Sequence, residues 1–385
     1  MADPVMSEPV AHSSAHVPPG SLRVGLIGYG YAGKTFHAPL VQSVPGLELC
    51  AVASSRADDV RADLPEMTVY PDPAMLMAQP DIDLVVIASP NSTHAELARM
   101  ALEGGKAVVV DKPFTVTLAE ARDLVARAGA GHPLLSVFQN RRWDSDFLTV
   151  QKAIADGLIG RVTHFESHFD RFRPVVRPRW REKAGVGAGV WFDLGPHLVD
   201  QALLLFGLPD RIQASMAAQR TGAETDDWAH VILTYGERRI ILQASMLVAG
   251  GRRRFVVHGD EGSLEKAEPD RQEAQLLEGL SPGGPGWGED PDALVVHIGD
   301  GSIRRIAAQT GDQRVFYVGV REAMRGSGSN PVPAIQALAV MAVVEAAALS
   351  AQSGKSVETG LTTAEYAEWQ EDRATRPDTG ISPFW

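Results

Sequence analysis

Residues 24–33 read VGLIGYGYAG, and this stretch decides the fold of the first part of the chain. A strand-like run leads directly into three glycines with the spacing G-x-G-x-x-G. Glycines at these positions permit a tight turn, let the backbone approach a pyrophosphate and allow close packing of the helix that follows, whose N-terminus faces the phosphates. A purely structural turn is the alternative. The cofactor-binding residues predicted from this turn are Gly28, Tyr29, Gly30, Ala32 and Gly33.

Short apolar runs and amphipathic segments alternate from residue 23 to about residue 140. The runs are apolar or β-branched on both faces, which is typical of strands buried in a parallel sheet. Segments 91–103 and 117–128 have helical periodicity and can cover that sheet. The predicted strands are residues 24–27, 49–53, 68–70, 84–88, 107–110 and 134–138. This part of the sequence predicts a doubly wound α/β domain.

After Arg142 the pattern changes to alternating polar and apolar residues, which is typical of strands with one buried face. Such strands predict a largely antiparallel sheet that is covered on one side. A helix is predicted at 146–155. The predicted strands are residues 162–172, 212–218, 230–235, 239–247 and 255–258.

Two later segments stand out by composition. Residues 279–291 are dense in glycine and proline, so we expect a surface excursion there. Residues 334–350 form a mostly apolar helical run that stops before Gly354. Because an apolar helix must be covered, we expect it between the domains, on the first sheet or against another subunit.

The chain of 385 residues is long enough for two domains. We expect an N-terminal Rossmann domain with a doubly wound parallel sheet (21–142) and a C-terminal α/β domain with a large, mostly antiparallel open sheet (143–328). A flexible tail (1–20) and a C-terminal helix and tail packed on both domains (329–385) complete the predicted organisation.

Composition narrows the classes of function. The chain has 36 Lys plus Arg against 48 Asp plus Glu, and its formal charge of −12 opposes binding to nucleic acid and anionic membranes. Cys50 is its single cysteine, so it has no internal disulfide, and no Cys/His cluster has metal-ligand spacing. No apolar run reaches the length of a membrane span. We expect a cytoplasmic protein without metal, nucleic-acid or membrane partners.

The end of the second predicted strand indicates which dinucleotide binds. NAD-specific proteins usually place an acidic residue there for the ribose hydroxyl, whereas this chain has Ser54, Ser55 and Arg56. Hydroxyls and a guanidinium suit a 2′-phosphate, so NADP is favoured, with NAD as the alternative. Arg56 could instead be a loop residue that pairs with Asp58 or Asp59.

Two further strand ends carry polar residues at the edge where ligands sit in doubly wound sheets. Asn91 could equally serve as a helix N-cap, and Lys112 could point into the crevice or simply be exposed. The predicted cofactor-binding residues at these two ends are Ser89, Pro90, Asn91, His94, Asp111 and Lys112.

Residues 185–200, GVGAGVWFDLGPHLVD, supply candidate proton-transfer groups. Offsets of four and three place Asp193, His197 and Asp200 on one side of a predicted helix. A carboxylate beside an imidazole fixes its tautomer and brings its pKa near neutrality, as proton transfer requires. A capping aspartate and a surface histidine are the alternative.

The chain resembles the family of glucose-fructose oxidoreductase, inositol dehydrogenase and MocA-like proteins in four motifs that come in the family's order. They are GYGYAGK (28–34), SPNSTH (89–94), DKPF (111–114) and DLGPHLVD (193–200). The runs NRRWDSDFLTV (140–150) and FESHFDRFRP (165–174) resemble the subgroup that contains NADP-dependent scyllo-inositol dehydrogenases. The resemblance implies a Rossmann domain and an α/β domain whose open sheet commonly builds homodimers or homotetramers.

The resemblance also implies roles for individual residues. Lys112, Asp193 and His197 match the family's catalytic group. Asp111 departs from the family pattern, which usually has Glu there, and the shorter acid could shift Lys112 slightly while preserving the charge.

Three residues are candidates for the substrate side, together with Asp193 and His197. Arg171 and Arg173 could hydrogen-bond several hydroxyls, and Trp180 could offer a flat apolar face to a sugar ring. A solvated arginine and a core tryptophan are the alternatives.

The sequence and the resemblance together predict an oxidoreductase that uses NADP to interconvert a secondary alcohol and a ketone on a cyclic polyol or sugar. His197 is expected to take the hydroxyl proton, Lys112 to stabilise the oxygen, and Asp193 to orient both. Two alternatives remain: a family enzyme with a different redox substrate, and a regulatory protein that binds NADP and a sugar phosphate without turnover. The presence of both proton-handling groups argues against the regulator.

Overall fold

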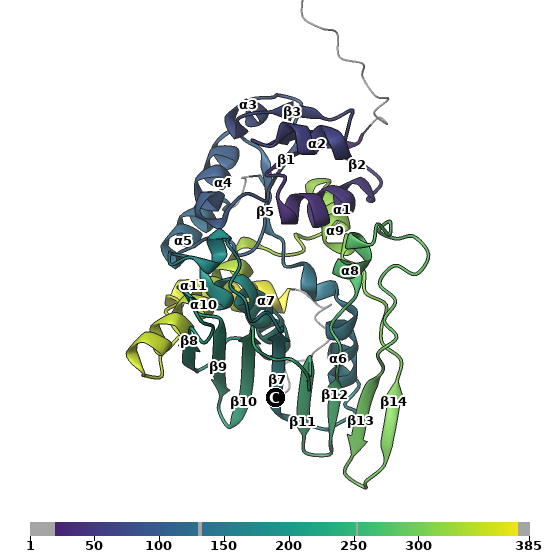
Figure 1. Cartoon of the computed structure of the whole chain (residues 1–385), viewed down its shortest axis with the longest axis vertical. Helices are drawn as coiled ribbons and strands as arrows, with labels where there is room; N and C mark the ends of the chain where they lie inside the picture. Colours follow the sequence, from purple (N-terminus) through teal and green to yellow (C-terminus); the bar gives the residue numbers. More distant parts are fainter. Residues whose placement is uncertain (1–19, 130–132, 252, 376–385) are drawn as a thin grey trace, which may run out of the picture.

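The computed structural model describes residues 20–129, 133–251 and 253–375, and it contains two sheets flanked by helices (Figure 1). Nearly all of the predicted N-terminal tail therefore lies outside the described residues. In Figure 1 the first sheet lies in the upper half of the molecule and the second in the lower half, with long helices between them.

The first sheet is parallel throughout and has the strand order β3-β2-β1-β4-β5-β6. Its strands are β1 (Leu22–Ile27), β2 (Leu47–Ala53), β3 (Thr68–Tyr70), β4 (Leu84–Ile87), β5 (Ala107–Val110) and β6 (Leu135–Val137). Every residue of β4 and β5 is buried, as expected of strands covered on both faces. The order reverses between β1 and β4, the position at which doubly wound sheets bind ligands. The predicted doubly wound α/β architecture is confirmed.

Helices pack around this sheet. They are η1 (Gly33–His37), α1 (Ala38–Gln42), α2 (Ala57–Asp63), α3 (Pro73–Met77), η2 (Asn91–Thr93), α4 (His94–Glu103) and α5 (Leu118–Arg127). The helix after the glycine turn starts with a π-helical segment, η1, before it continues as α1. A capping box starts α5, because Thr117 and Glu120 each accept a hydrogen bond from the other's backbone N–H.

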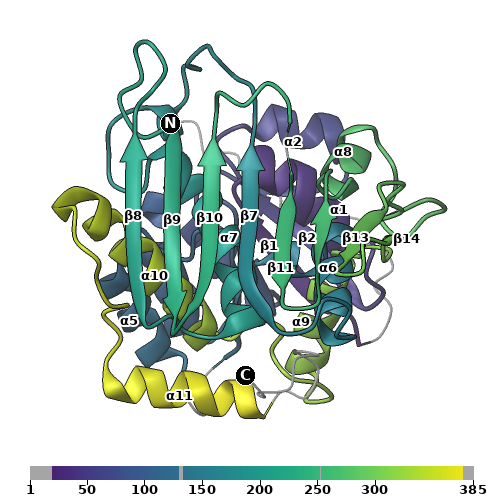
Figure 2. The ribbon, with the colours of Figure 1, turned by 90° about the horizontal axis from the view of Figure 1, so that it is seen from below.

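The second sheet has the order β14-β13-β12-β11-β7-β10-β9-β8. Its strands are β7 (Val162–Asp170), β8 (Arg211–Ala217), β9 (Trp228–Tyr235), β10 (Arg238–Ser245), β11 (Phe255–Gly259), β12 (Gly262–Lys266), β13 (Leu294–Ile298) and β14 (Ile303–Ile306). All pairs except β7 with β10 are antiparallel. In β7 the buried Phe165, Ser167 and Phe169 alternate with less buried residues. Figure 2 shows the open face in front, with α6 (Ser145–Ala155) and α7 (Gly189–Phe206) behind the strands, so the predicted open sheet is confirmed.

Some strand predictions need correction. The predicted strands 162–172 and 239–247 end at Asp170 and Ser245, and beyond them Phe172 and Leu247 pair in an isolated bridge. Three strands, β12, β13 and β14, were not predicted. They span five, five and four residues.

The apolar helix is α10 (Ala334–Ser353), and it lies between the two halves of the molecule. It contacts α5 from the first half and both α7 and β8 from the second. Trp191 of α7 donates a hydrogen bond to the carbonyl oxygen of Val344, 3.0 Å away. By length and composition α10 could cross a membrane, but 78% of its most apolar window is buried inside the protein. We expected α10 to pack between the domains, on the first sheet or against another subunit. The structure shows it between the domains.

Shorter elements complete the chain. They are η3 (Asn140–Trp143), η4 (Trp180–Glu182), α8 (Gln272–Leu277), α9 (Arg314–Met324) and α11 (Thr363–Ala374). Residues 279–291, where we expected a surface excursion, form no helix or strand, but side-chain contacts hold the segment against the protein. Trp287 is buried, and the Gln275 side chain hydrogen-bonds the backbone of Gly286 and Gly288.

Candidate active site

The glycine turn after β1 leaves no room for side chains. Gly28 has a φ of +94°, and a Cβ there would lie 2.7 Å from the carbonyl oxygen of Ala88. A Cβ on Gly33 would overlap the carbonyl oxygen of Gly28. These glycines therefore meet two physical demands of a dinucleotide turn, which are unusual backbone angles and close helix packing. Between them, Tyr29 is buried and Ala32 is partly buried.

Arg56 lies over this turn. Its Nη2 donates a hydrogen bond to the carbonyl oxygen of Tyr29 at 2.7 Å, and a Cβ on Gly30 would lie 3.6 Å from the same nitrogen. The guanidinium also lies 3.7 Å from the carboxylate of Asp59, so the expected alternative pairing is present but long. More than half of the arginine side chain is exposed. Its remaining N–H groups are therefore accessible to a ligand at the turn.

No carboxylate follows β2 at the position where NAD-specific proteins carry one. Ser54 is buried and its hydroxyl accepts a hydrogen bond from the backbone N–H of Arg56 at 3.0 Å, whereas Ser55 is exposed. The residues around the turn therefore fit a dinucleotide that carries a 2′-phosphate.

The loop after β4 links the two halves of the molecule. The amide of Asn91 donates to the carbonyl oxygen of Gly187 at 2.9 Å, and its Oδ1 is buried without a partner among the described residues. The helix-capping alternative for Asn91 is therefore wrong. The Ser89 hydroxyl is 2.7 Å from that of Thr93, and Pro90 is exposed beside it.

His94 contacts the loops that follow β4 and β5. It is buried, and its two ring nitrogens lie 2.8 Å from the carbonyl oxygen of Pro113 and 3.0 Å from that of Ser89. Burial lowers its pKa despite the nearby Asp111. That His94 binds the cofactor stays a prediction, and in the structure its side chain contacts the loop that carries Lys112.

Lys112 and Asp193 form a contact between the two halves of the molecule. Nζ of Lys112, which follows β5, lies 2.8 Å from the carbonyl oxygen of Asp193 and 3.3 Å from its Oδ1. Nε of Arg181 lies 3.4 Å from the same Oδ1. Burial alone would raise the pKa of Asp193, but Lys112 and Arg181 lower it to about 2. The aspartate is therefore an ionised anchor for the lysine.

His197 follows Asp193 by one turn of α7 and is buried. No hydrogen bond joins the two side chains, and Nδ1 of His197 has no partner among the described residues. Burial, followed by the charges of Lys112 and Arg141, lowers the pKa of His197 well below 6.5. The expectation of a carboxylate that brings this pKa near neutrality is wrong, because Asp193 is held by two cations instead. His197 is therefore a neutral imidazole that can accept a proton.

The predicted substrate-side residues lie at the end of β7 and in the loop after it. Arg171 is partly buried, and its charged neighbours include Asp193 and Glu273. Arg173 is more exposed, and its charged neighbours include Arg171. Trp180 is 39% exposed, so the core-tryptophan alternative is wrong. The guanidinium of Arg181 covers its ring at 4.5 Å from the centroid.

Comparison with known proteins identifies the family. Residues 22–139 match the model described as oxidoreductase family, NAD-binding Rossmann fold, and residues 151–359 match the model of the same family's C-terminal alpha/beta domain. The chain belongs to the Gfo/Idh/MocA oxidoreductase family. It is therefore an oxidoreductase-family protein in which residues 22–139 form an NAD-binding Rossmann domain.

Its similarity to individual members of the Gfo/Idh/MocA family covers most of its length. Uncharacterized oxidoreductase YdgJ of Escherichia coli is 50% identical over 84% of this chain and 95% of its own length. The scyllo-inositol 2-dehydrogenase (NADP(+)) IolW of Bacillus subtilis is 34% identical over 88% of this chain and 96% of its own. A crystal structure from Klebsiella pneumoniae has 55% identity and a TM-score of 0.87, and covers 92% of this chain and all of its own.

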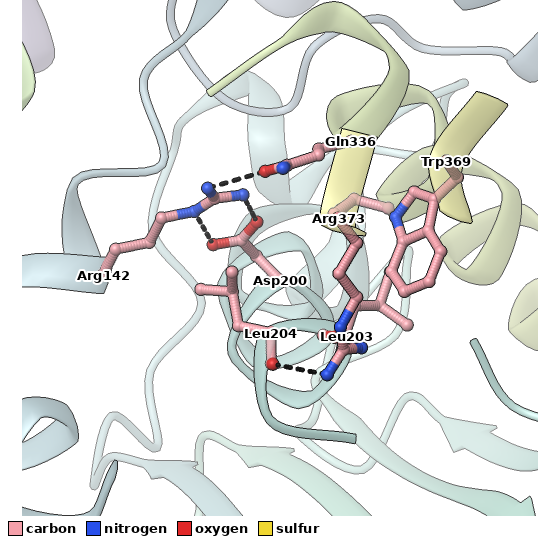
Figure 3. Close-up of a pocket in the computed structure, with 8 residues that line it drawn as sticks. Arg142, Asp200, Leu203, Leu204, Gln336, Trp369 and Arg373 are labelled. Atoms are coloured by element: carbon pink, nitrogen blue, oxygen red, sulfur yellow. Dashed lines mark hydrogen bonds and ion pairs between the residues drawn. The ribbon is translucent and has the colours of Figure 1, made fainter. Parts of the chain in front are cut away.

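Asp200 pairs with Arg142, not with Lys112 or His197. Its carboxylate receives two hydrogen bonds from Arg142, at 2.6 and 2.9 Å, and Figure 3 shows this pair beside Gln336. The pair lines a separate cavity, together with Trp369 and Arg373 of α11. Asp193, His197 and Asp200 all lie in α7 as expected, but Asp200 pairs with a buried arginine on η3.

Asp111 is also turned away from ligands in this family member. It is buried, and its Oδ1 lies 3.5 Å from Nε2 of His37. Burial acts to raise the pKa of Asp111, but His37 and Lys112 lower it overall. The other nitrogen of His37 lies 2.6 Å from the hydroxyl of Tyr317 on α9. Neither residue was predicted, and no local pattern links positions 280 residues apart.

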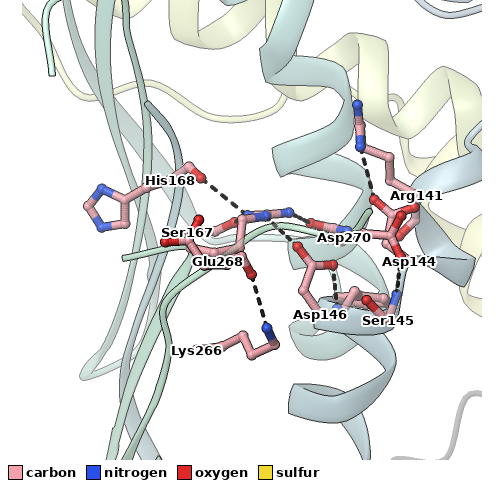
Figure 4. Close-up of polar contacts among 12 residues, drawn as sticks. Arg141, Asp144, Ser145, Asp146, Ser167, His168, Lys266, Glu268 and Asp270 are labelled. Carbon is pink, nitrogen blue, oxygen red and sulfur yellow. Dashed lines mark hydrogen bonds and ion pairs between the residues drawn. The ribbon is translucent and has the colours of Figure 1, made fainter. Parts of the chain in front are cut away.

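A second unpredicted group ties the glycine turn to the second half. Glu273 on α8 accepts a hydrogen bond from the Tyr31 hydroxyl at 2.7 Å and from Arg141 at 2.9 Å. Arg141 also donates to Asp144 at 3.0 Å, a contact visible in Figure 4. Arg141 lies in residues 140–150, the run NRRWDSDFLTV. This run resembles the scyllo-inositol dehydrogenase subgroup, but the sequence alone assigns no role to its residues. These contacts join the glycine turn to α8 and η3.

Proposed function

We propose that this oxidoreductase uses NADP to interconvert a secondary alcohol and a ketone on a cyclic polyol or sugar. The observation that carries the proposal is the pairing of an anchored ammonium with a neutral imidazole. Lys112 is held by Asp193, and His197 is buried one turn farther along α7 with a pKa well below 6.5. A fixed cation and an unprotonated base are what removal of a hydroxyl proton requires.

The residues divide the work between them. The neutral His197 takes the proton from the substrate hydroxyl, and the ammonium of Lys112 stabilises the negative charge that develops on the oxygen. Asp193 acts as a positioning residue, since its backbone carbonyl oxygen and its Oδ1 both accept hydrogen bonds from Nζ of Lys112. Bound NADP supplies the hydride acceptor for the carbon that bears the hydroxyl.

Two observations support NADP over NAD. Arg56 lies over the glycine turn with more than half of its side chain exposed, and Ser54 and Ser55, not an acidic residue, directly follow β2. IolW, 34% identical, carries NADP(+) in its name, and that name also supports a polyol as the substrate class.

A second copy of the chain is the expected partner, in a homodimer or homotetramer. Ile232 of β9 and Ile241 of β10 pair on the open face of the second sheet, and both are only partly buried within one chain. Apolar side chains on an uncovered face favour self-association. A cytoplasmic location remains part of the proposal and agrees with the single cysteine.

A regulatory protein that binds the cofactor and a sugar without turnover is the other candidate. It would have no need for an anchored lysine beside a neutral histidine. The two functions differ in a direct assay.

The purified protein is mixed with NADP⁺ and a panel of inositols, hexoses and their acids, and absorbance of the reduced nicotinamide is followed. The proposal predicts substrate-dependent reduction that Lys112→Met slows by about 10²- to 10⁴-fold while dinucleotide binding persists. Tight binding of dinucleotide and sugar without reduction of NADP⁺ by any member would favour the regulator.

A further inference from the structure

Arg254 is a buried cation that the proposed function does not use. It directly precedes β11, and only 3% of the residue is exposed. Its Nε donates to Oδ2 of Asp146 on α6 at 2.9 Å, and its Nη1 donates to the hydroxyl of Ser167 on β7 at 2.6 Å. Its Nη2 donates to Oε1 of Gln201 on α7 at 2.7 Å. Hydrogen bonds to three different elements therefore fix the plane of this guanidinium.

The fixed guanidinium lies over two phenyl rings. Its Cζ is 4.0 Å from the ring centroid of Phe169 on β7 and 4.0 Å from that of Phe255 on β11. A cation over an aromatic face is attracted by the quadrupole of the ring, and the attraction is strongest where both groups are withdrawn from water. Phe169 is 8% exposed and Phe255 is fully buried. The same side chain therefore holds both rings in place.

Phe169 also packs against the proposed base. Its ring centroid lies 6.2 Å from that of the His197 imidazole, and the two planes are inclined at 69°, an edge-to-face arrangement. Phe255 instead neighbours the ring of Phe165, at 5.7 Å between centroids. The two phenyl rings thus share the contact with Arg254 but have different aromatic neighbours.

The orientation of the His197 imidazole depends on such packing. The residue is buried, and its Nδ1 has no hydrogen-bond partner among the described residues. A base must be held in the orientation in which it accepts the proton, and a misplacement of about 1 Å can cost about 10²-fold in rate. Because no hydrogen bond to Nδ1 fixes the imidazole, the neighbouring ring of Phe169 has this task.

We infer that Phe169 is a positioning residue for the proposed base: its ring, held by Arg254, keeps the imidazole of His197 in the orientation that accepts a proton. Arg254 is tied to the same helix a second time, because Gln201 follows His197 by four residues in α7. This inference rests on the proposed function and deepens it by naming what holds the base.

The first experiment compares two variants on the best substrate of the polyol and sugar panel with NADP⁺. Phe169→Leu should lower kcat at least about tenfold and leave KM for the substrate and the affinity for NADP⁺ within about twofold, because it changes only the orientation of the base. Phe255→Leu is the matched control, since it removes the other ring from the same guanidinium. It should lower kcat by less than about twofold.

The outcomes separate this inference from the proposed function. Equal losses of kcat in the two variants would show that the rings act only through the packing around Arg254, and would overturn the inference. Retention of most of kcat by Phe169→Leu would overturn it as well, while the proposed function stands. If the unaltered protein oxidises no compound of the panel, the proposed function fails, and this inference with it.

Proton NMR gives a readout that does not depend on turnover. The imidazole resonances of His197, identified by their loss in His197→Ala, should move in Phe169→Leu and stay in place in Phe255→Leu, because Phe169 borders the imidazole. Unmoved His197 resonances in Phe169→Leu would show that this ring does not set the position of the base, and would overturn the inference.

The part played by Arg254 is tested with Arg254→Lys, which keeps a positive charge beside Asp146 and removes the planar guanidinium. It should lower kcat as Phe169→Leu does. The double variant should be little worse than the worse single one, because both residues act through one imidazole. Losses of kcat that simply multiply would show that Arg254 and Phe169 act independently, and would overturn the role of Arg254.

Discussion

Nζ of Lys112 lies 2.8 Å from the carbonyl oxygen of Asp193 and 3.3 Å from its Oδ1, and this contact joins the two halves of the molecule. Lys112 follows a strand of the parallel sheet, whereas Asp193 lies in the helix that covers the antiparallel sheet. The proton-handling group is therefore assembled only when both halves are folded and docked. Asn91 and Glu273 reinforce the same junction through their hydrogen bonds to Gly187 and Tyr31.

Cofactor choice is tested at Arg56. Arg56→Ala should weaken NADP⁺ binding by about 1.5 to 3 kcal/mol and NAD⁺ binding much less, because only the 2′-phosphate gains the charge-assisted contact. Calorimetry with each dinucleotide measures both effects. Arg61→Ala alters an exposed residue of α2, the helix that Arg56 precedes; it is the matched control and should change neither affinity. Equal losses of both dinucleotides in Arg56→Ala would refute the role of Arg56.

The pH profile of alcohol oxidation is tested through His197. The neutral imidazole is the active form, and it is lost only as the pH falls through its folded pKa, which lies well below 6.5. We therefore expect kcat/KM to show no acidic decline between about pH 7.5 and about pH 6.5. In Arg171→Gln one cation that lowers this pKa is gone, so the acidic limb should move to higher pH. An acidic limb centred near 6.5 in the unaltered protein would contradict this account.

The buried pair of Asp200 and Arg142 is expected to matter for stability rather than for chemistry. Asp200→Ala leaves a buried guanidinium without its carboxylate, which should lower the free energy of unfolding by about 3 to 5 kcal/mol. Urea denaturation measures this change. Asp156→Ala removes a carboxylate from an exposed pair with Lys152 and should cost less than about 1 kcal/mol. If Asp200→Ala and Asp156→Ala had the same free energy of unfolding, the buried Asp200–Arg142 pair would contribute no more to stability than the exposed pair.

Self-association is tested on the open face of the second sheet. Light scattering should return the mass of two or four chains, and Ile241→Arg should shift the protein toward single chains, because it places a long charged side chain on the open face beside Ile232. Leu349→Arg alters a residue on α10 that is 54% exposed and should leave the mass unchanged. A mass of one chain for the unaltered protein at micromolar concentration would remove this proposal.

The parts of the fold that could be predicted depend on local patterns. The glycine turn at Gly28 and Gly33 is encoded within a few residues, because backbone angle and close packing exclude any side chain there. The apolar character of α10 showed that it must be buried. It did not show whether α10 packs between the domains, on the first sheet or against another subunit. Only the packing against α5, α7 and β8 decides among them.

Relations between distant residues could not be predicted in the same way. Helical spacing placed Asp193 near His197, but the carboxylate is drawn to Lys112 and Arg181, which come from other elements. Asp200 fits the same spacing and is instead held by Arg142. The spacing of residues along a helix shows which of them share a face. It does not show which oppositely charged residue from another element lies closest to each of them.

The central claim is that Lys112 and His197 act on one oxygen, and turnover of the single and double variants on the best substrate tests it most directly. Lys112→Met and His197→Ala should each lower kcat by about 10² to 10⁴ with NADP⁺ affinity nearly intact, and the double variant should be little worse than the worse single one, because residues that act as a unit are strongly non-additive. Retention of most of kcat by either single variant, or losses in the double variant that simply multiply, would contradict the account.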